Sequence, residues 1–318
     1  MYTSGLSQFS VFCLMYGVSN GDIPSLVDED LLIRFVTHCA HSLKLKYSTI
    51  KCYLAGIRNA YIKRGNGDIM LDHRGCHRER LQLVLRGIKK CQHHTPQRRQ
   101  PITAAILRKL VTLLRVGVFG AYRDLIMEAA LVLGWFGCLR CGEFTAYTSE
   151  YDAWVHIAIK DVHEKYDTVI RKRFIEVLLK ASKTDPFHKG VLIKLFETGH
   201  LLCPYTVLSK LLTIRKSSCR NFNEPFFFLP DSSLLTRHVF VDNLRTLLGL
   251  IGENTGYMFA GHSLRRGLAT SASVAKIPDH LISSMGRWNS DCYKSYIEVP
   301  NNAIASAQST LADPMLCA

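Results

Sequence analysis

Residues 92–102, QHHTPQRRQPI, constrain the fold of this chain most, because they interrupt its apolar pattern. The segment is polar and basic, has no apolar periodicity and contains two Pro, a composition typical of a connection between domains. The length of 318 residues also exceeds the usual size of a single domain. We therefore expect a first domain over residues 1–92, a linker over residues 93–102 and a second domain over residues 103–318.

The first domain is predicted to be a small helical bundle with a basic face. Residues 25–43, SLVDEDLLIRFVTHCAHSL, start with a capping residue and acids and then repeat apolar positions at intervals of three and four. Residues 47–65, YSTIKCYLAGIRNAYIKRG, place an apolar stripe on one side of a helix and leave Lys and Arg off it. Residues 78–91, RERLQLVLRGIKKC, follow the same pattern.

The second domain is predicted to be mostly helical around a small sheet. Thr103 can cap one helix, and another follows from Tyr122. Near Trp154 the pattern changes to that of strands, over VHIAIKDV, RFIEVLLKASK and KGVLIKLF. The turn TDPFHKG between the last two contains Asp-Pro and Gly, which predicts a β-hairpin. After Cys203 the pattern is helical again, so the expected fold class is mainly α with a small antiparallel β-sheet.

The net charge of +14 favours a polyanionic partner. The charge is concentrated, since residues 51–100 contain 12 Lys and Arg against 3 Asp and Glu. A merely basic surface is the alternative interpretation. No signal peptide is recognised at the N-terminus. The longest apolar stretch, Leu125 to Leu139, contains Glu128 and is shorter than the roughly 20 residues of a membrane span, so it predicts a buried helix and no membrane partner.

The 11 Cys are odd in number and scattered, which favours a reducing intracellular compartment. The one CxxC motif, from Cys138 to Cys141, lies in an apolar helical run, and no second pair stands at metal-ligand spacing. A lone CxxC is weak evidence for zinc or redox chemistry. We therefore predict neither a metal nor a cofactor.

Two segments place Arg where a positive charge is unfavourable unless a partner stabilises it: in an apolar run and at the start of a helix. LGWFGCLRCGEF holds Arg140 in apolar sequence, where it must be paired or face a ligand, and an ion pair with Glu143 is the structural alternative. GHSLRRG places His262 and Arg265 at the start of a helix, where Ser263 is a good N-cap. The helix dipole disfavours cations there unless an anion such as a phosphate occupies the same place. The adjacent Arg266 is expected to face solvent or DNA backbone.

Two further segments complete the set. Lys183 stands at the tip SKTD of the predicted hairpin, where an exposed turn lysine is the simpler interpretation. MGRWNSDCYKSYI then brings Trp288, Tyr293 and Tyr296 within a few residues of each other. Each segment alone has a structural explanation, but their order and spacing together favour a shared site.

In this order the motifs resemble those of the tyrosine recombinase family, the phage-type integrases, over about residues 1–300. The SKTDPF hairpin and the ending from GRW to YI resemble the versions in eukaryotic mobile elements of the Crypton and DIRS kind. The resemblance implies an N-terminal helical core-binding (SAM-like) domain and a C-terminal catalytic domain with a tail. The catalytic residues that it implies are Arg140, Lys183, His262, Arg265, Trp288 and Tyr296.

Two of these assignments have alternatives. Tyr293 and Tyr296 lie three residues apart and would share a helix face, so spacing alone permits either as the nucleophile. The family's Tyr is followed by an apolar residue, as in KSYI, which favours Tyr296 and leaves Tyr293 to pack. Lys180 and Lys189 also border the hairpin, but the family setting matches Lys183.

The resemblance implies an enzyme that cleaves and rejoins DNA without a metal or ATP. Two guanidinium groups would hold the phosphodiester oxygens as negative charge develops. A Tyr with its usual pKa of about 10 needs help to lose its proton, and His262 would assist it. Lys183 would protonate the leaving 5′-oxygen, and the 3′-phosphotyrosyl bond would keep the energy for rejoining.

Other functions fit part of the same pattern. A monomeric type IB topoisomerase would use these residues to nick and reseal, whereas a recombinase must pair two sites. A silenced DNA-binding protein derived from a mobile element would be expected to have lost a catalytic side chain, and none is missing from the sequence. A zinc-dependent regulator fits least well.

The expected partner is double-stranded DNA, bound by a homotetramer on two paired sites in the nucleus. The first domain and the linker are predicted to contact the DNA backbone opposite the catalytic domain. The candidates are Lys44, Lys46, Lys51, Arg58, Arg98 and Arg99. The tail, residues 300–318, either packs on its own domain or docks on a neighbouring protomer.

Overall fold

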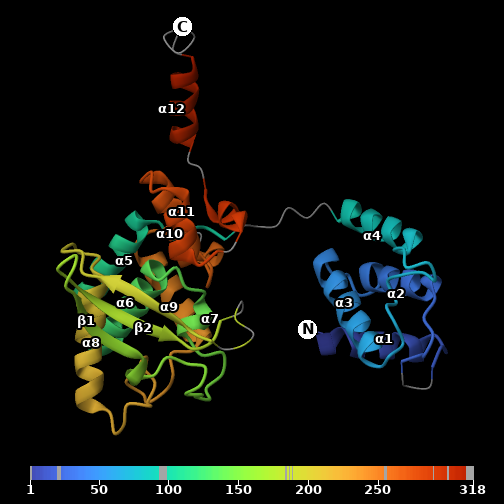
Figure 1. Ribbon diagram of the computed structural model, residues 1–318, viewed down its shortest axis with the longest axis horizontal. Coiled ribbons are helices and arrows are strands. Elements are labelled where there is room, and N and C mark those ends of the chain that lie inside the picture. Colours follow the sequence, from blue (N-terminus) through green and yellow to red (C-terminus); the bar gives the residue numbers. More distant parts are fainter. Residues whose placement is uncertain are drawn as a thin grey trace. The chain divides into compact units, whose positions relative to one another are not determined.

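The computed structural model describes residues 2–19, 23–92, 99–182, 185, 187, 189–253, 256–288, 290–298 and 301–312. The chain divides into two compact units, Met1–Pro96 and Gln97–Ala318 (Figure 1). Each unit has its own hydrophobic core. Residues 93–98 of the expected linker lie outside the described residues, Arg98 among them, and so does Lys183, which the sequence placed at the hairpin tip.

The helices of the first unit are α1 (Tyr2–Met15), α2 (Glu29–His41), α3 (Tyr47–Lys63) and α4 (Glu79–Cys91). The last three lie within the segments predicted from apolar periodicity, which confirms those predictions. Asp28 caps α2, because its side chain accepts a hydrogen bond from the backbone N–H of Leu31 at 2.7 Å. The apolar stripes meet in a core that includes Phe9, Phe35 and Ile57.

The second unit contains a buried helix, α6 (Ala121–Phe136), among its helices. These helices are α5 (Ala104–Val116), α6, α7 (Cys141–Phe144), α8 (Pro204–Ser218), α9 (Arg237–Leu250), α10 (Ser263–Val274), α11 (Asp279–Gly286) and α12 (Asn301–Leu311). Helix α6 is buried almost throughout, as the apolar run predicted, and α5, α8 and α10 pack against it. Thr103 caps α5, and its Oγ1 accepts a hydrogen bond from the N–H of Ile106 at 3.4 Å.

The sheet has three antiparallel strands in the order β1 (Val162–Asp167), β2 (Lys172–Leu179) and β3 (Val191–Phe196). Strands β2 and β3 confirm the predicted hairpin, with Val177 opposite Ile193. Helix α8 packs against β2 and β3 (Figure 1). The fold class is therefore as predicted, mainly α with a small antiparallel sheet.

The strand predicted over residues 155–162 is wrong. This segment forms turns and a 3₁₀ helix, Ile159–Asp161, in which the Asp161 carboxylate accepts a hydrogen bond from the N–H of Ala158 at 2.7 Å. Its apolar residues Ile157, Ala158 and Ile159 are buried, whereas Val155 is exposed. The first strand is instead the polar segment VHEKYD, whose side chains are mostly exposed because β1 lies at the sheet edge.

Residues 99–102, which the sequence placed in the linker, are bound to the second unit. The N–H of Gln100 donates to the carbonyl of Met258 at 3.0 Å, and the N–H of Ile102 donates to the carbonyl of Ser263 at 2.9 Å. Ile102 is fully buried, and its carbonyl accepts a hydrogen bond from Nε1 of Trp135 at 2.8 Å. The connection between the units is therefore shorter than residues 93–102.

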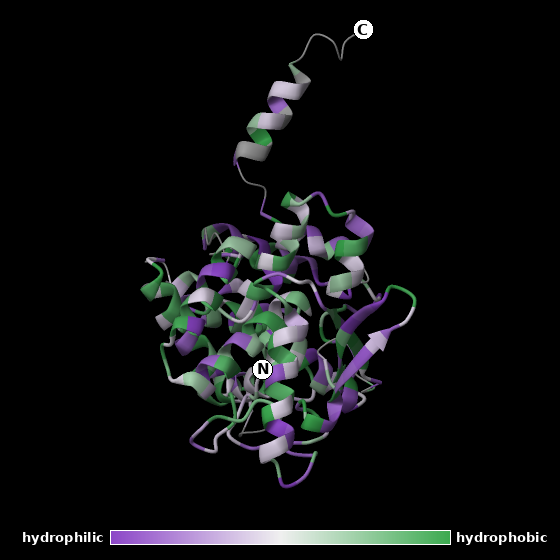
Figure 2. Ribbon diagram, turned by 90° about the vertical axis from the view of Figure 1, so that its left-hand side faces the viewer, coloured by the Kyte–Doolittle hydropathy of each residue, from purple (hydrophilic) through white to green (hydrophobic). Residues whose placement is uncertain are grey.

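Helix α12 lies at the C-terminal end of the described chain. Figure 2 shows both polar and apolar residues along it. Ile304 in this helix is largely exposed. Among the described helices, α12 included, none is long and apolar enough to cross a membrane.

The contact between α10 and residue 102 gives a prediction about stability. A Cβ added at Gly267 would lie 1.8 Å from the carbonyl oxygen of Ile102. We expect Gly267→Ala to lower the free energy of unfolding by about 1–3 kcal/mol or more, because neither backbone can move aside freely. Urea unfolding followed by tryptophan fluorescence measures this in the second unit, where all 3 Trp lie.

The matched control is Gly249→Ala in α9, where an added Cβ meets nothing within 4 Å. Ala favours a helix over Gly by about 1 kcal/mol, so this variant should be as stable as the wild type or more stable. Equal stability of the two variants would contradict the packing of residue 102 on α10.

Candidate active site

Arg140 is positioned by a break between α6 and α7. Cys138 has a left-handed backbone (φ 49°) that turns the chain, and Arg140 then takes the N-cap position of α7. Its N–H donates to Oε2 of Glu143 at 2.9 Å, and its Nη1 donates to Oε1 at 2.9 Å. Glu143 therefore holds both the backbone and the side chain of Arg140. The ion pair weighed from the sequence is present, and 21% of the Arg140 side chain is exposed.

Arg265, in the first turn of α10, is almost completely buried, with 1% of the residue exposed. Its Nη2 donates to the carbonyl of Gly286 at 2.6 Å, and its Nη1 donates to the carbonyl of Cys138. The guanidinium carbon also lies 4.3 Å from the centroid of the Trp288 ring. Two carbonyls and a ring face therefore stabilise a charge that would otherwise be costly to bury.

Trp288 reaches Arg265 because Gly286 leaves room for its ring. A Cβ at Gly286 would lie 1.8 Å from a ring carbon of Trp288. Ser283 holds the same turn, since its hydroxyl donates to the carbonyl of Trp288 at 2.8 Å. The Gly and the Trp of the GRW motif therefore serve the same purpose, because together they place the Trp288 ring against the Arg265 guanidinium.

The two candidate tyrosines have different surroundings. The ring centroid of Tyr296 lies 5.7 Å from the guanidinium carbon of Arg265 and 5.4 Å from the Trp288 ring, and the residue is partly exposed. Tyr293 is buried, and its hydroxyl donates to Oδ2 of Asp279 at 2.9 Å. This hydrogen bond raises the pKa of Tyr293. Tyr293 thus packs as expected, and the ring beside the arginines belongs to Tyr296.

The structure adds Arg287, which the sequence analysis did not single out. It ends α11 with a left-handed backbone (φ 55°, ψ 42°), a conformation that is uncommon for a residue other than Gly and is often found at functional sites. Its Nη2 donates to Oε2 of Glu143 at 3.1 Å, and 23% of its side chain is exposed. The sequence feature that could have identified Arg287 is its place inside the GRW motif.

We call Arg140, Arg265, Arg287 and Glu143 the arginine cluster. Burial lowers the pKa of Arg265, and the charges of Arg140 and Arg287 lower it further. Three guanidinium groups against one carboxylate leave an excess of positive charge, which favours a bound anion. Cys138, beside the cluster, is a buried free thiol whose pKa burial raises to about 11.

Two details of the GHSLRRG segment differ from expectation. Ser263 is not the N-cap of α10: His262 takes that position and is exposed, while the Ser263 hydroxyl accepts a hydrogen bond from the N–H of Ala260 at 2.9 Å. Arg266 does not face solvent. It is buried and pairs with Glu298, a partner 32 residues away that local sequence does not reveal.

The hairpin lysines are only partly accounted for, because Lys183 lies outside the described residues. Lys180 pairs with Asp161 and donates to the carbonyl of Ala153 at 2.6 Å, so it has a structural role. Lys189 is exposed.

The basic residues predicted to contact DNA fall into two groups. Lys44, Lys46 and Lys51 are exposed in the first unit. Arg58 is paired with Asp68, since its Nε donates to Oδ2 at 2.9 Å. In the second unit, Arg99 is exposed and donates to the carbonyl of Tyr257 at 2.7 Å.

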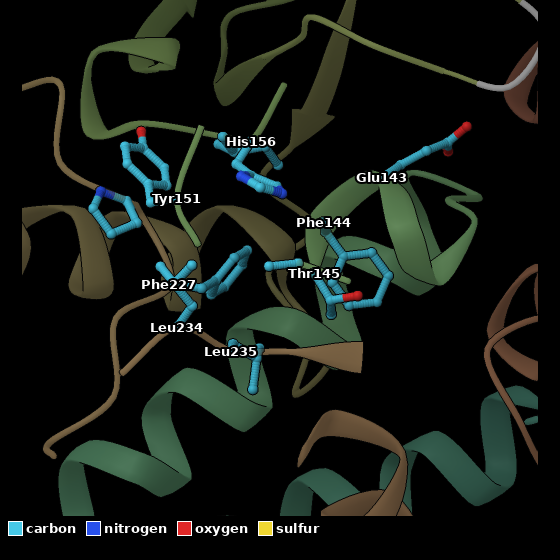
Figure 3. A pocket seen from close by; sticks show the side chains of 11 residues that line it. Glu143, Phe144, Thr145, Tyr151, His156, Phe227, Leu234 and Leu235 are labelled. Atoms are coloured by element: carbon cyan, nitrogen blue, oxygen red, sulfur yellow. The ribbon is translucent and has the colours of Figure 1, made fainter. Parts of the chain in front are cut away.

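A small pocket adjoins α7, and Figure 3 shows that Glu143 extends away from the other labelled side chains around it. The hydroxyl of Tyr151 donates to the carbonyl of Asn223 at 2.7 Å, and Nδ1 of His156 accepts a hydrogen bond from the N–H of Asp152 at 3.0 Å. Burial lowers the pKa of His156. These hydrogen bonds hold the loops of the pocket together.

Comparison with known proteins identifies the fold. No protein-family model matches the sequence, and no curated protein matches it significantly. The XerH site-specific recombinase in a pre-cleavage complex with its difH substrate aligns over 97% of this chain and 78% of its own, with a TM-score of 0.57 at 15% identity. The Tn1549 transposon integrase in complex with transposon right end DNA aligns over 96% and 99%, with a TM-score of 0.55 at 12% identity. This chain has the two-domain fold of the tyrosine recombinases.

The carboxylate of Glu143, which Arg140 and Arg287 share, gives a prediction about stability. Glu143→Ala leaves two partly buried guanidinium groups and one backbone N–H without their acceptor. We expect the free energy of unfolding to fall by about 2–4 kcal/mol, measured by urea unfolding. The control Glu197→Ala removes an exposed pair with Arg173 and should cost less than about 1 kcal/mol. Equal losses in the two variants would mean that Glu143 does not organise the cluster.

Proposed function

We propose that the chain is a site-specific tyrosine recombinase that cleaves and rejoins DNA through a 3′-phosphotyrosyl intermediate. The observation that carries the proposal is the meeting of Arg140, Arg265, Trp288 and Tyr296, which come from three separate segments of the second unit. The fold supports it, because solved structures with this fold include recombinases and integrases in complex with DNA. The resemblance of the motifs extends to eukaryotic mobile elements, which makes the nucleus the proposed compartment.

The proposed reaction is a transesterification at phosphorus. The Tyr296 oxygen forms a bond to phosphorus while the bond from phosphorus to the 5′-oxygen breaks. The phenol proton passes to His262 or to water, and Lys183 supplies a proton to the leaving 5′-oxygen. The guanidinium groups stabilise the charge that develops on the non-bridging oxygens. A 5′-hydroxyl of a partner strand reverses the reaction, so the step requires neither ATP nor a metal ion.

Strand exchange needs two DNA sites, each bound by two protomers, and we therefore propose a homotetramer. Helix α12 is the candidate contact between protomers, because it follows Tyr296 closely and exposes Ile304. A heterologous contact of this kind closes into a ring.

The proposed nucleophile can be tested directly. We expect Tyr296→Phe to abolish covalent protein–DNA adducts and to leave DNA affinity nearly unchanged, because only the phenol oxygen is removed. Full-length protein is incubated with nicked duplexes that were selected for binding from a random-sequence pool, and adducts are resolved on denaturing gels. The wild-type adduct should also form in EDTA.

Tyr293→Phe is the matched control, since it removes a hydroxyl that is bonded to Asp279. This variant should still form the adduct. Loss of the adduct in Tyr293→Phe alone would move the nucleophile to Tyr293. A wild-type protein that binds the duplex and forms no adduct would be a DNA-binding protein without strand cleavage.

The first unit should contribute phosphate contacts that depend on salt. We expect Lys51→Ala to reduce the slope of log affinity against log salt concentration by about one. Arg58→Ala should change the slope less, because Arg58 is already paired with Asp68. Fluorescence anisotropy with the selected duplex measures both slopes. An unchanged slope in Lys51→Ala would remove this residue from the DNA interface.

A further inference from the structure

We propose that Arg287 binds the scissile phosphate together with Arg140, and that Arg265 lies behind this pair. The inference rests on the proposed strand cleavage and extends it, because it assigns a direct contact with a non-bridging phosphate oxygen to a residue outside the six implied by the motifs. Arg287 would then be a catalytic residue.

Exposure separates the three arginines. The side chains of Arg140 and Arg287 are 21% and 23% exposed. Arg265 is 1% exposed, both of its Nη atoms donate to backbone carbonyls, and the Trp288 ring lies against it. A phosphate that approaches the cluster in this conformation can therefore reach Arg140 and Arg287 before it reaches Arg265.

The two exposed guanidinium groups are held by the same carboxylate. Arg140 donates through Nη1 to one oxygen of Glu143 at 2.9 Å, and Arg287 donates through Nη2 to the other at 3.1 Å. Glu143 is itself buried, so it fixes both groups with little freedom. Two guanidinium groups fixed side by side in this way form a preorganised site for a tetrahedral anion.

Arg287 also has a hydrogen-bond donor, Nη1, that lacks an acceptor in the described part of the chain. Among the residues that the structure describes, its Nη1 is inaccessible to solvent and has no hydrogen-bond partner. A buried donor without an acceptor is costly, and a phosphate oxygen would satisfy it once the side chain turns this atom toward solvent. Within those residues, Nε of Arg265 is buried and unpaired in the same way. The left-handed backbone of Arg287 ends α11, and the N–H of Arg287 donates to the last turn of that helix, so this conformation sets the direction of the side chain.

The neighbours of Arg287 both contact Arg265. The carbonyl of Gly286 accepts a hydrogen bond from Arg265, and the ring of Trp288 covers it. The turn therefore uses Gly286 and Trp288 to bury one arginine and presents the next one, Arg287, at the surface of the cluster.

The first experiment requires no DNA cleavage. Thermal unfolding of the full chain is followed in inorganic phosphate and in chloride of equal ionic strength, since a ligand that binds the folded state raises Tm. We expect phosphate to raise Tm of the wild type and of the control Arg173→Ala, which removes an exposed ion pair on β2. In Arg287→Ala most of the phosphate-specific rise should be lost, and Arg287→Lys should restore part of it.

The second experiment measures the contact during cleavage. One set of nicked duplexes has the ordinary scissile phosphate, and a second set has a neutral methylphosphonate in its place. We expect Arg287→Ala to slow adduct formation about 100-fold on the phosphate. On the methylphosphonate the loss should be less than about 10-fold, because the charge that Arg287 contacts is absent. If Arg287 only supported the fold around Glu143, the loss would be the same on both substrates. If it acted through Arg140, Arg287→Ala would cause no further loss on the phosphate in an Arg140→Ala background.

The outcomes separate this inference from the proposed function. An unchanged phosphate effect and unchanged cleavage in Arg287→Ala would overturn the inference and leave the recombinase proposal standing. A phosphate effect that depends on Arg287, in a wild-type protein that forms no adduct, would confirm the phosphate site and overturn the proposed cleavage. Equal losses on both substrates, with an unchanged phosphate effect, would reduce Arg287 to a positioning residue.

Discussion

The carboxylate of Glu143 accepts hydrogen bonds from the guanidinium groups of Arg140 and Arg287 and from one backbone N–H, and the remainder of the site depends on this arrangement. Three like charges cannot be brought together in a partly buried place unless something compensates them. Glu143 compensates two of them, while backbone carbonyls and the Trp288 ring compensate Arg265. Positive charge still exceeds negative charge, so the folded chain keeps a site that an anion would stabilise.

Two residues that contact or belong to the arginine cluster have an unusual backbone conformation. Cys138 and Arg287 both adopt left-handed backbone conformations, and each stands next to a group that serves the cluster. The carbonyl of Cys138 accepts a hydrogen bond from Arg265, and Arg287 itself binds Glu143. Neither residue type favours this conformation, so the surrounding packing must impose it. Lys44, Arg171, Ser232 and Lys276 adopt the same conformation outside the cluster, so it is the contacts of Cys138 and Arg287, and not the strain alone, that belong to the site.

Periodicity and capping predicted α2, α3, α4 and α5, because each has an apolar face that local sequence shows, and a long apolar run predicted the buried helix α6. Strand β1 was missed, since an exposed edge strand has no apolar pattern to detect. Motif spacing placed Arg140, Arg265, Trp288 and Tyr296 in one site, and the structure brings their side chains together. Arg266 was placed wrongly and Arg287 was not singled out, because their partners lie 32 and 144 residues away.

The same ring couples the burial of Arg265 to the position of Tyr296. The Trp288 ring lies 4.3 Å from the Arg265 guanidinium and 5.4 Å from the Tyr296 ring, and Gly286 leaves no room between itself and that ring. The rings of Trp288 and Tyr296 both lie against the Arg265 guanidinium, so a phosphate oxygen that approaches from this side would displace one of them. Because the two rings are in contact, a displacement of either one also changes the surroundings of the tyrosine hydroxyl. In the proposed reaction, exposure of Arg265 and placement of the Tyr296 hydroxyl would therefore be coupled, and Arg140 and Arg287 are the groups proposed to hold the phosphate meanwhile.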